Sequence, residues 1–363
     1  MQFIDLKQQY ELYKPEILAE INAVLDSGRY ILGPAVTELE SELAAYTGVK
    51  HAIACSSGTD AIMLALMALE LRPGDEVIVP DFTFFATAET VSLLGGRPVF
   101  VDIRPDTYNL DPARVEKSRG PRTRGIMAVS LYGQCADFGA LADIARRRGL
   151  FLIEDGAQSF GATQNGRRSC SLTGVATTSF YPAKPLGAYG DGGAVFTTDD
   201  ALAERIRSLL NHGQVASYRH RYVGINGRLD SLQAAVLKVK LRHFDEELAR
   251  RQQVARWYDE ELAGVVATPA ILPRNNCSWA QYTVRHPDRD RIQEHLKSRG
   301  IPTAVHYPLP VHRQEAYADL GYPDRELENA TAASREVFSL PMHPFLTRDQ
   351  VQMVTAAIRE AAK

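Results

Sequence analysis

The stretch His51-Ala-Ile-Ala-Cys-Ser-Ser-Gly-Thr-Asp60 combines a short apolar run, a small polar loop and the start of an apolar helix that continues to Leu69. This pattern predicts a strand that leads directly into a helix N-terminus. Free backbone N–H groups and the positive end of the helix dipole then face the loop, and both favour an anion. Gly58 and Thr59 would be placed to hold a phosphate. The simpler alternative is that a serine or threonine of the loop only caps the helix.

The same alternation of strand and helix continues along the first half of the chain. Further strands are expected at 76–79, 98–101, 126–129 and 151–153, and helices at 86–95 and 140–148. Strands that alternate with helices of this length imply right-handed crossovers and a largely parallel sheet covered on both faces. The fold class is therefore α/β. Ligands on such sheets lie beyond the carboxyl ends of the strands, here after Cys55, Pro80, Val129 and Ile153.

The length of the chain predicts two domains. Its 363 residues exceed the span of one usual core, which is about 250–300 residues. A long helix is expected from Leu229 to Leu262, and after it the composition changes. Strand-like segments at 281–285 and 303–307 and helices at 289–299 and 347–361 then predict a smaller α+β unit. We expect a large domain over residues 1–245 and a small C-terminal domain over residues 246–363.

Charge and cysteine content exclude several classes of protein. The net charge is −3, from 41 basic and 44 acidic residues without a run of one sign, so binding of nucleic acid or a membrane surface through bulk charge is not expected. The four cysteines form no CxxC pair, which favours a reducing compartment and argues against a cysteine-built metal site. With no signal-peptide pattern and no apolar run of spanning length, we expect a cytoplasmic protein with no membrane partner.

A lysine stands out in Ser179-Phe-Tyr-Pro-Ala-Lys-Pro-Leu-Gly-Ala-Tyr-Gly-Asp-Gly-Gly193. Two prolines flank Lys184 and four glycines follow it, so the bent backbone holds the side chain at a defined point. An amine becomes nucleophilic when an apolar or cationic setting lowers its pKa, and a carbonyl compound can then trap it as a Schiff base. The alternative is an ordinary solvated lysine, since proline and glycine also mark plain turns.

Asp155 is expected at the carboxyl end of a strand, with Gln158 following it closely in the same crevice. A carboxylate there could cap a helix, bind a metal or pair with a protonated ring nitrogen. No second acid or histidine at ligand spacing supports a metal site, so we expect no metal.

Together these residues fit pyridoxal 5′-phosphate. That cofactor needs an amine for a Schiff base, an acid beside its ring nitrogen, an anion site for its phosphate and a flat group against its ring. Lys184, Asp155, the Gly58-Thr59 loop with Ser179, and an aromatic residue of Phe82-Thr-Phe84 supply these four parts. Asp155 would stay ionised because a cationic ring nitrogen favours the carboxylate.

At this point the chain resembles the pyridoxal-phosphate-dependent sugar aminotransferases of the DegT/DnrJ type, which have the type I, aspartate-aminotransferase-like fold. The resemblance covers essentially the full length. Its motifs are Tyr30-Ile-Leu-Gly-Pro34, Ser57-Gly-Thr59, Phe82-Thr-Phe-Phe-Ala-Thr87, Glu154-Asp155, Gln158, Ser179-Phe-Tyr-Pro-Ala-Lys184, Gly190-Asp-Gly-Gly193, Gly224-Ile-Asn-Gly-Arg-Leu-Asp230 and His306-Tyr-Pro308.

The resemblance implies a role for each matching residue. Lys184 would form the Schiff base, Asp155 would pair with the ring nitrogen, Gln158 would bond the ring hydroxyl, Phe84 would stack on the ring, and Gly58, Thr59 and Ser179 would hold the phosphate. Asn226 would reach the cofactor phosphate of a neighbouring subunit. The resemblance therefore also implies a homodimer with shared active sites.

A narrower likeness points to a substrate. The stretches 131–138, 167–171, 280–285 and 339–344 resemble family members that aminate C3 of a UDP-linked 2-acetamido-3-oxo-glucuronic acid with glutamate as donor. Such nucleotide sugars serve surface polysaccharides of the O-antigen type. Arg228, His306 and Tyr307 are the candidates for contacts with the phosphates, carboxylate or hydroxyls of the substrate. For His306, a hydrogen bond between the two domains is the alternative.

Four alternatives remain open at this stage. The enzyme could act on another keto sugar, such as a 4-oxo-6-deoxy nucleotide sugar. A sugar dehydratase of the same family would replace the lysine by histidine or add cysteines for an iron–sulfur cluster, and the chain shows neither. The intact Lys184, Asp155 and Gln158 argue against a regulatory member without turnover. A nicotinamide enzyme would need a strand–GxGxxG–helix unit near the start, which is missing.

Overall fold

The computed structural model describes residues 1–118 and 120–362, and its centre is a seven-stranded sheet of order β1-β9-β8-β5-β4-β2-β3. The strands are β1 (His51–Cys55), β2 (Glu76–Pro80), β3 (Arg97–Val101), β4 (Thr123–Val129), β5 (Phe151–Asp155), β8 (Val175–Ser179) and β9 (Gly193–Thr197). Pairing is parallel from β8 through β5, β4 and β2 to β3, while β9 runs antiparallel to both of its neighbours. The mostly parallel sheet confirms the predicted α/β class.

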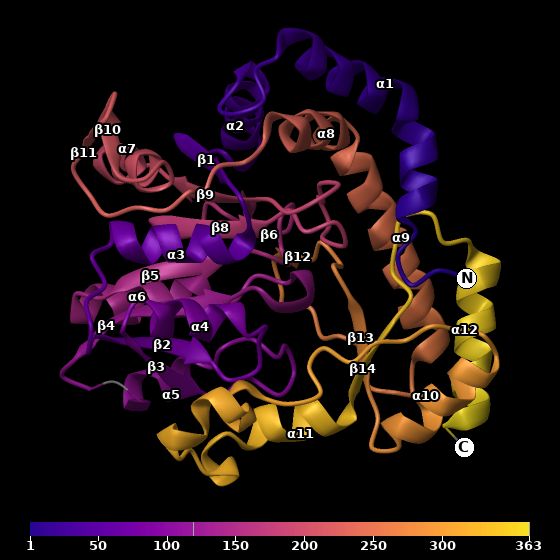
Figure 1. Ribbon diagram of the computed structural model, residues 1–363. Helices are drawn as coiled ribbons and strands as arrows, with labels where there is room; N and C mark the ends of the chain where they lie inside the picture. The colour runs from indigo at the N-terminus through magenta and orange to yellow at the C-terminus, as the bar shows by residue number, and fades with distance from the viewer. Residues whose placement is uncertain (119, 363) are drawn as a thin grey trace.

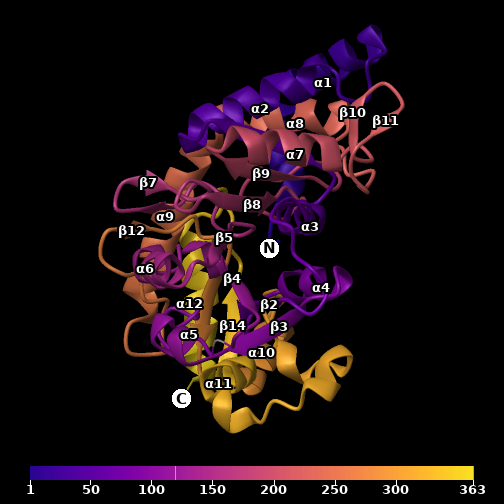
Figure 2. The same cartoon turned by 90° about the vertical axis from the view of Figure 1, so that its left-hand side faces the viewer.

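Helices cover both faces of this sheet (Figures 1 and 2). One face packs against α3 (Gly58–Ala68), α4 (Ala86–Leu93) and α7 (Asp200–Leu209), and the other against α2 (Pro34–Thr47), α5 (Pro112–Ser118), α6 (Phe138–Arg148) and α8 (Ser231–Arg242). Alternate residues of β1 serve the two cores: Ile53 and Cys55 on one side, Ala52 and Ala54 on the other. With both faces closed, the edge formed by the carboxyl ends of the strands is where loops can build a site.

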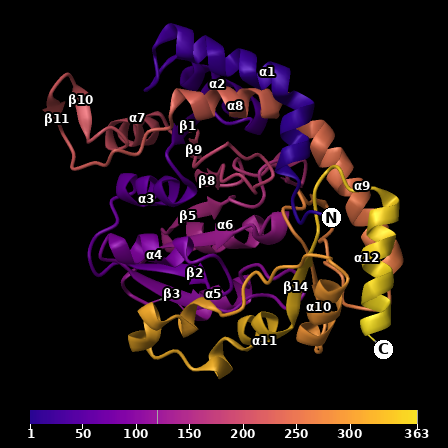
Figure 3. The same cartoon turned by 45° about the vertical axis from the view of Figure 1, so that its right-hand side comes forward.

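A second core lies in the C-terminal third of the chain. It joins α9 (Phe244–Leu262), α10 (Arg289–Ser298) and α12 (Arg348–Ala361) to the antiparallel pair β13 (Tyr282–Arg285) and β14 (Val337–Leu340), which stand together beside the large sheet in Figure 3. The predicted division at residue 245 falls at the start of α9 and stays a prediction. The segment from Val311 to Leu327 packs instead against the core of the large sheet.

The remaining elements are short or peripheral. They are α1 (Leu6–Ser27), α11 (Glu328–Glu336), the short strands β6 (Thr163–Gln164), β7 (Arg167–Arg168), β10 (Gln214–Ala216), β11 (Arg219–His220) and β12 (Asn275–Asn276), and the 3-10 turns η1 (Leu131–Gly133), η2 (Val311–Arg313), η3 (Glu315–Leu320) and η4 (Asp324–Glu326). The hairpin of β10 and β11 projects beyond α7 in all three views. Within residues 1–118 and 120–362, no helix has both the length and the apolarity to cross a membrane.

Two local predictions were wrong. The helix expected from Leu229 to Leu262 is broken at His243 (φ −98°, ψ 0°), because that ring stacks on Tyr13 of α1 at 4.2 Å and bonds Glu16 at 3.0 Å. The strand expected at 303–307 is reduced to a single bridge between Ala304 and β14. In both cases contacts with a distant part of the chain outweigh the local pattern.

Candidate active site

The loop that carries Lys184 connects β8 to β9 and folds back on itself. Phe180 N donates to Gly192 O, and Ala188 N donates to Phe180 O, both at 2.7 Å. These bonds close the loop beyond the carboxyl end of β8, where a Cβ added at Gly187 would collide with the backbone oxygen of Pro182. The structure thereby holds the lysine at the sheet edge.

Lys184 and Asp155 lie within electrostatic reach of each other. Asp155 ends β5 and is 4% exposed; Thr87 Oγ1 donates to its Oδ2 and Ala157 N donates to its Oδ1, each at 3.1 Å. Burial lowers the pKa of Lys184, and the charge of Asp155 opposes this shift only in part. Burial likewise raises the pKa of Asp155. The Ala157 amide, the charge of Lys184 and the Thr87 hydroxyl each lower this pKa but do not cancel the effect of burial. The site thus holds an amine with an increased neutral fraction beside a carboxyl group that a second cation would ionise.

Gln158 is buried and already holds two partners. Its Oε1 accepts from Tyr132 N at 2.7 Å, and its Nε2 donates to Tyr307 Oη at 3.1 Å. An amide nitrogen has two hydrogens, so one N–H of Gln158 remains for the ring hydroxyl that the sequence assigned to it. The Tyr132 hydroxyl donates to the backbone oxygen of His306.

Gly58 and Ser179 meet where the first turn of α3 approaches the end of β8. A Cβ added at Gly58 would lie 2.6 Å from Ser179 Cβ, so only glycine fits there. Ser57 caps α3 by accepting from Asp60 N at 3.0 Å, whereas the amides of Gly58 and Thr59 have no acceptor within the helix. The two interpretations are compatible: Ser57 caps the helix, and the amides of Gly58 and Thr59 beside the Ser179 hydroxyl are free to serve as the predicted anion cradle, which stays a prediction.

Phe84 presents its ring to the site, unlike Phe82. Both rings lie beside Tyr307, with centroid distances of 6.2 Å for Phe84 and 6.0 Å for Phe82, but Phe84 is 56% exposed whereas Phe82 is 1% exposed and belongs to the core. The choice of Phe84 over Phe82 as the stacking residue is consistent with this difference, although its contact with a cofactor stays a prediction.

His306 lies within electrostatic reach of Lys184. Burial, followed by the charge of Lys184, lowers the pKa of His306 to about 4. Its Nδ1 is 3.0 Å from Ser339 Oγ of β14. The imidazole is therefore neutral near pH 7 and acts as a hydrogen-bonding group rather than as a cation.

Asn226 and Arg228 lie apart from the lysine, on the strand-like segment that follows the β10–β11 hairpin. Arg228 Nη1 donates to Asn211 Oδ1 at 2.7 Å, and its backbone bridges Cys55 at the entrance to the anion cradle. Asn226 is exposed and its backbone bridges Asn211. The contacts of the described residues do not join Asn226 to Lys184, and the role of Asn226 toward a neighbouring subunit stays a prediction.

Sequence reasoning missed two residues that organise the site. Thr87 bonds Asp155, and Tyr132 ties Gln158 to the His306 backbone. Thr87 belongs to the quoted motif at 82–87, so its position on the turn into α4 was a usable signal. Tyr132 carries a positive φ of 58°, which no pattern in its sequence indicates.

The residues brought together fit pyridoxal phosphate. The Gly58 cradle suits a phosphate because it offers free amides at a helix N-terminus. The Lys184–Asp155 pair suits a carbonyl group and a protonated ring nitrogen, and the exposed face of Phe84 suits a flat ring.

Comparison with known proteins gives close relatives over the full length. The chain is 54% identical over 359 residues to UDP-2-acetamido-2-deoxy-3-oxo-D-glucuronate aminotransferase of Pseudomonas aeruginosa, with 99% of each chain covered. It is 47% identical over 361 residues to the pleiotropic regulatory protein of Geobacillus stearothermophilus, with 98% and 97% covered.

Solved structures agree in fold. DesV of Streptomyces venezuelae, in complex with a ketimine intermediate, superposes with a TM-score of 0.98 at 46% identity and covers 100% of this chain and 98% of its own. NtdA of Bacillus subtilis, with bound cofactor PMP, superposes with a TM-score of 0.89 at 30% identity, and the match covers 96% of this chain and 81% of NtdA. These matches confirm the predicted type I fold. The DegT/DnrJ/EryC1/StrS aminotransferase family itself matches residues 12–359, and the chain belongs to that family.

Proposed function

We propose that this chain is a pyridoxal-phosphate-dependent aminotransferase that moves the amino group of glutamate to C3 of a UDP-linked 2-acetamido-3-oxo-glucuronic acid. The product would enter a surface polysaccharide of the O-antigen type. The observation that carries the proposal is the Lys184–Asp155 pair, with a half-buried lysine and a buried aspartate, in a chain 54% identical to the Pseudomonas aeruginosa enzyme over 99% of its length.

When bound, the cofactor supplies an electron sink for the carbon that loses a proton. Lys184 would hold it covalently and Asp155 would face its ring nitrogen. The remaining holding residues are Gly58, Thr59 and Ser179 at the phosphate, Gln158 at the ring hydroxyl and Phe84 on the ring face. A cation on the ring nitrogen lowers the pKa of Asp155 and offsets the effect of its burial.

Lys184 is the proton-transfer group of the proposed reaction. After the amine of glutamate has displaced it from the cofactor, the free Nζ would take the proton from the α-carbon of glutamate and, in the second half-reaction, would return a proton to C3 of the sugar. A general base works best when its pKa is near the operating pH. The burial that lowers the pKa of Lys184 therefore enlarges the neutral fraction that this step needs.

The substrate contacts follow from charge. Arg228 is a permanent cation at the mouth of the anion cradle and suits a phosphate or the uronic carboxylate. His306, whose pKa of about 4 leaves it neutral, and Tyr307 suit sugar hydroxyls or the keto oxygen.

A homodimer with shared sites is part of the proposal. Large apolar side chains are exposed on the β10–β11 hairpin (Tyr218, 95%), on the segment after it (Val223, 92%) and on the loop before α2 (Ile31, 50%, and Tyr30, 47%). A second copy of the chain would cover them and bring its Asn226 to the cradle. The cytoplasmic location stays a prediction.

The test is a glutamate-dependent amination assay. UDP-linked 3-oxo uronic acid should be aminated with ping-pong kinetics, and Lys184→Ala should abolish both turnover and the near-visible absorbance of lysine-linked cofactor. Activity only on 4-oxo-6-deoxy nucleotide sugars would refute the glucuronate assignment and leave the aminotransferase assignment standing. Binding of cofactor without turnover of any keto sugar would favour a regulatory member. Water release from the sugar without amine transfer would favour a dehydratase.

A further inference from the structure

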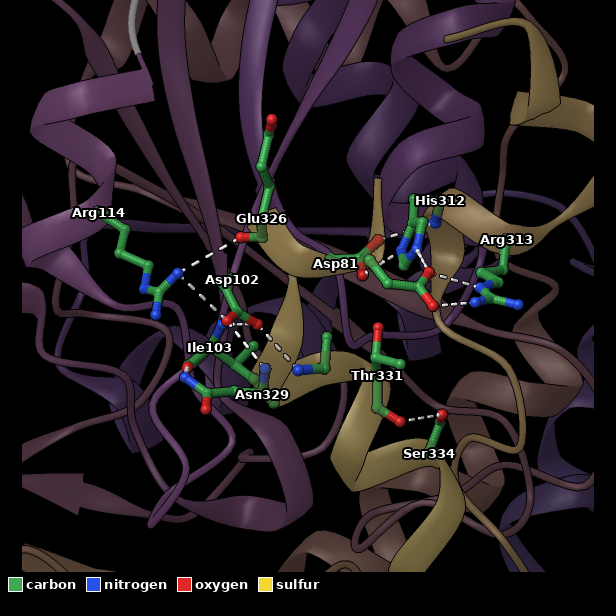
Figure 4. Close-up of polar contacts among 12 residues, drawn as sticks. Asp81, Asp102, Ile103, Arg114, His312, Arg313, Glu326, Asn329, Thr331 and Ser334 are labelled. Carbon is green, nitrogen blue, oxygen red and sulfur yellow. Dashed lines mark hydrogen bonds and ion pairs between the residues drawn. The ribbon is translucent and has the colours of Figure 1, made fainter. Parts of the chain in front are cut away.

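His312 is a buried histidine that the proposed reaction does not use. It lies in η2 and is 6% exposed. Its Nδ1 is 2.6 Å from Oδ2 of Asp81, and its Nε2 is 3.1 Å from Oδ1 of Asp324. Figure 4 shows the ring of His312 directed at Asp81, with Arg313 alongside. Both ring nitrogens therefore face carboxylates.

With both carboxylates ionised, this geometry is satisfied only when His312 carries two protons. Neutral imidazole has a single N–H, so one of its nitrogens would turn a lone pair toward a carboxylate. Burial lowers the pKa of His312, but the bonds and charges of Asp81 and Asp324 outweigh it, and the net pKa is raised. Burial raises the pKa of Asp81 as well. Both shifts favour a proton held between His312 and Asp81.

The other charged groups around the cluster are already engaged. Arg313 Nε donates to Asp324 Oδ1 at 2.7 Å, which fixes the outer carboxylate. Asp102, whose charge also acts on Asp81, accepts from the backbone N of Asn329 at 3.0 Å at the start of α11 (Figure 4). The imidazolium is therefore the group that neutralises the fully buried Asp81.

The cluster joins two segments that line the candidate active site. Asp81 directly follows β2 and precedes the Phe82–Thr87 turn that carries Phe84. Its backbone O accepts from Val311 N at 2.9 Å and its Oδ1 accepts from His312 N at 2.8 Å. On the other side, His312 ends the short connection from Tyr307. The cluster thus lies at the start of the Phe82–Thr87 turn and at the end of the connection from Tyr307 to His312. These two segments meet again where the ring centroids of Phe84 and Tyr307 are 6.2 Å apart.

We propose that His312 is a positioning residue of the active site: its imidazolium, held between Asp81 and Asp324, fixes the Phe84 turn relative to the Tyr307 segment and so sets the slot for the cofactor ring. This inference rests on the proposed roles of Phe84 and Tyr307. A charge-assisted, two-sided bond suits the task because it is stronger and more directional than a neutral one.

The first test reads the proton directly. Nitrogen NMR of protein labelled with 15N-histidine, assigned with His312→Gln, should show both ring nitrogens protonated at pH 7.5. Asp324→Asn should move the midpoint of this titration to lower pH, because one carboxylate is lost. A neutral His312 at pH 7 would overturn the inference. This reading is made on the natural chain without cofactor, and the variants serve only for assignment and for the shift of the midpoint.

The second test measures cofactor affinity against pH. His312→Gln should weaken pyridoxal phosphate binding about tenfold, as expected for the loss of a charge-assisted hydrogen bond. In the natural chain the affinity for pyridoxal phosphate should fall as rising pH removes the proton from His312. In Asp324→Asn this fall should begin at a lower pH. The control is His295→Gln, since His295 pairs with Glu360 on the far helices α10 and α12 and its loss should leave the affinity unchanged.

The outcomes separate this inference from the proposed function. Unchanged cofactor affinity and an unchanged pH profile in both His312→Gln and Asp324→Asn would overturn the positioning role. Failure to aminate the uronic sugar would affect the proposed substrate alone, because neither test uses a sugar.

Discussion

The hydroxyl of Thr87 donates to Oδ2 of Asp155 at 3.1 Å and links the turn before α4 to the carboxyl end of β5. The other carboxylate oxygen accepts from the Ala157 amide. With both oxygens held, the carboxylate has one orientation before any ligand arrives. Thr87 also lies 3.0 Å from Thr83 Oγ1, so the donor itself is positioned by its own turn.

Replacing Thr87 with valine should weaken cofactor binding. Thr87→Val keeps the shape but removes the donor, which leaves a buried carboxylate oxygen unpaired and further raises the pKa of Asp155. We expect the dissociation constant of pyridoxal phosphate to rise about tenfold, the usual loss for a hydrogen bond to a charged group. Thr87→Ser, which keeps the donor, is the matched control. Equal affinities of the valine and serine variants would show that the bond has no part in holding the cofactor.

Replacing Gly58 should weaken binding of the cofactor's phosphate and not of its ring. Gly58→Ala brings a methyl group to 2.6 Å from Ser179 Cβ and so displaces the cradle. Pyridoxal phosphate should bind far more weakly to this variant, whereas pyridoxal, which lacks the phosphate, should lose little of its weaker affinity. Gly139→Ala on α6, where an added Cβ meets only Asp137 Oδ1 at 3.5 Å, serves as control. An equal loss for both ligands would point to general disruption instead of a phosphate site.

The parts of this site that sequence predicted are those set by local order on a parallel sheet. Asp155 and Ser179 each end a strand and the Gly58 loop follows one directly, so the sheet edge collects them whatever the rest of the chain does. Lys184 follows from the proline and glycine pattern around it. For these residues, the strand and its carboxyl end, both read from the sequence, were enough to place the side chain at the edge of the sheet.

The parts that sequence did not predict depend on contacts between distant segments. The bonds of His312 to Asp81 join residues far apart in the chain, and neither local pattern indicates the other. The break at His243 likewise depends on Tyr13 of α1. A helical pattern continues across that residue, and only tertiary packing decides that the helix stops there.

Lys240 should make stability depend on pH. It is 3% exposed, its Nζ donates to Gly187 O at 2.6 Å below the Lys184 loop, and burial lowers its pKa to about 7 against the opposing charge of Glu247. The unfolded chain keeps this amine protonated to about pH 10. Between these values the unfolded state binds more protons, so stability rises with pH; below about pH 7 both states are protonated and the dependence ends.

The measurement compares urea unfolding of the natural chain with that of Lys240→Met from pH 6 to pH 9.5. Above pH 7 the unfolding free energy of the natural chain should rise relative to that of Lys240→Met by up to about 1.4 kcal/mol per pH unit. Lys7→Met, at an exposed position of α1, should show no such trend. A difference that is constant with pH would mean that Lys240 stays charged in the folded protein.

Mixing two inactive variants tests the shared site. Asn226→Asp places a negative charge where the neighbour's cofactor phosphate would lie, and Lys184→Ala removes the reactive amine. If Lys184 and Asn226 of different subunits form one site, a hybrid dimer has one intact site, with Lys184 from one chain and Asn226 from the other. Each variant alone should be inactive, and an equal mixture after subunit exchange should recover about a quarter of the natural activity, because half the dimers are hybrids with one working site of two. If both residues belonged to the same subunit's site, every site in the mixture would lack one of them and activity would not return. Light scattering during the same experiment checks that dimers are present, so the absence of recovery in a confirmed, exchanged dimer would place Asn226 outside the neighbour's site.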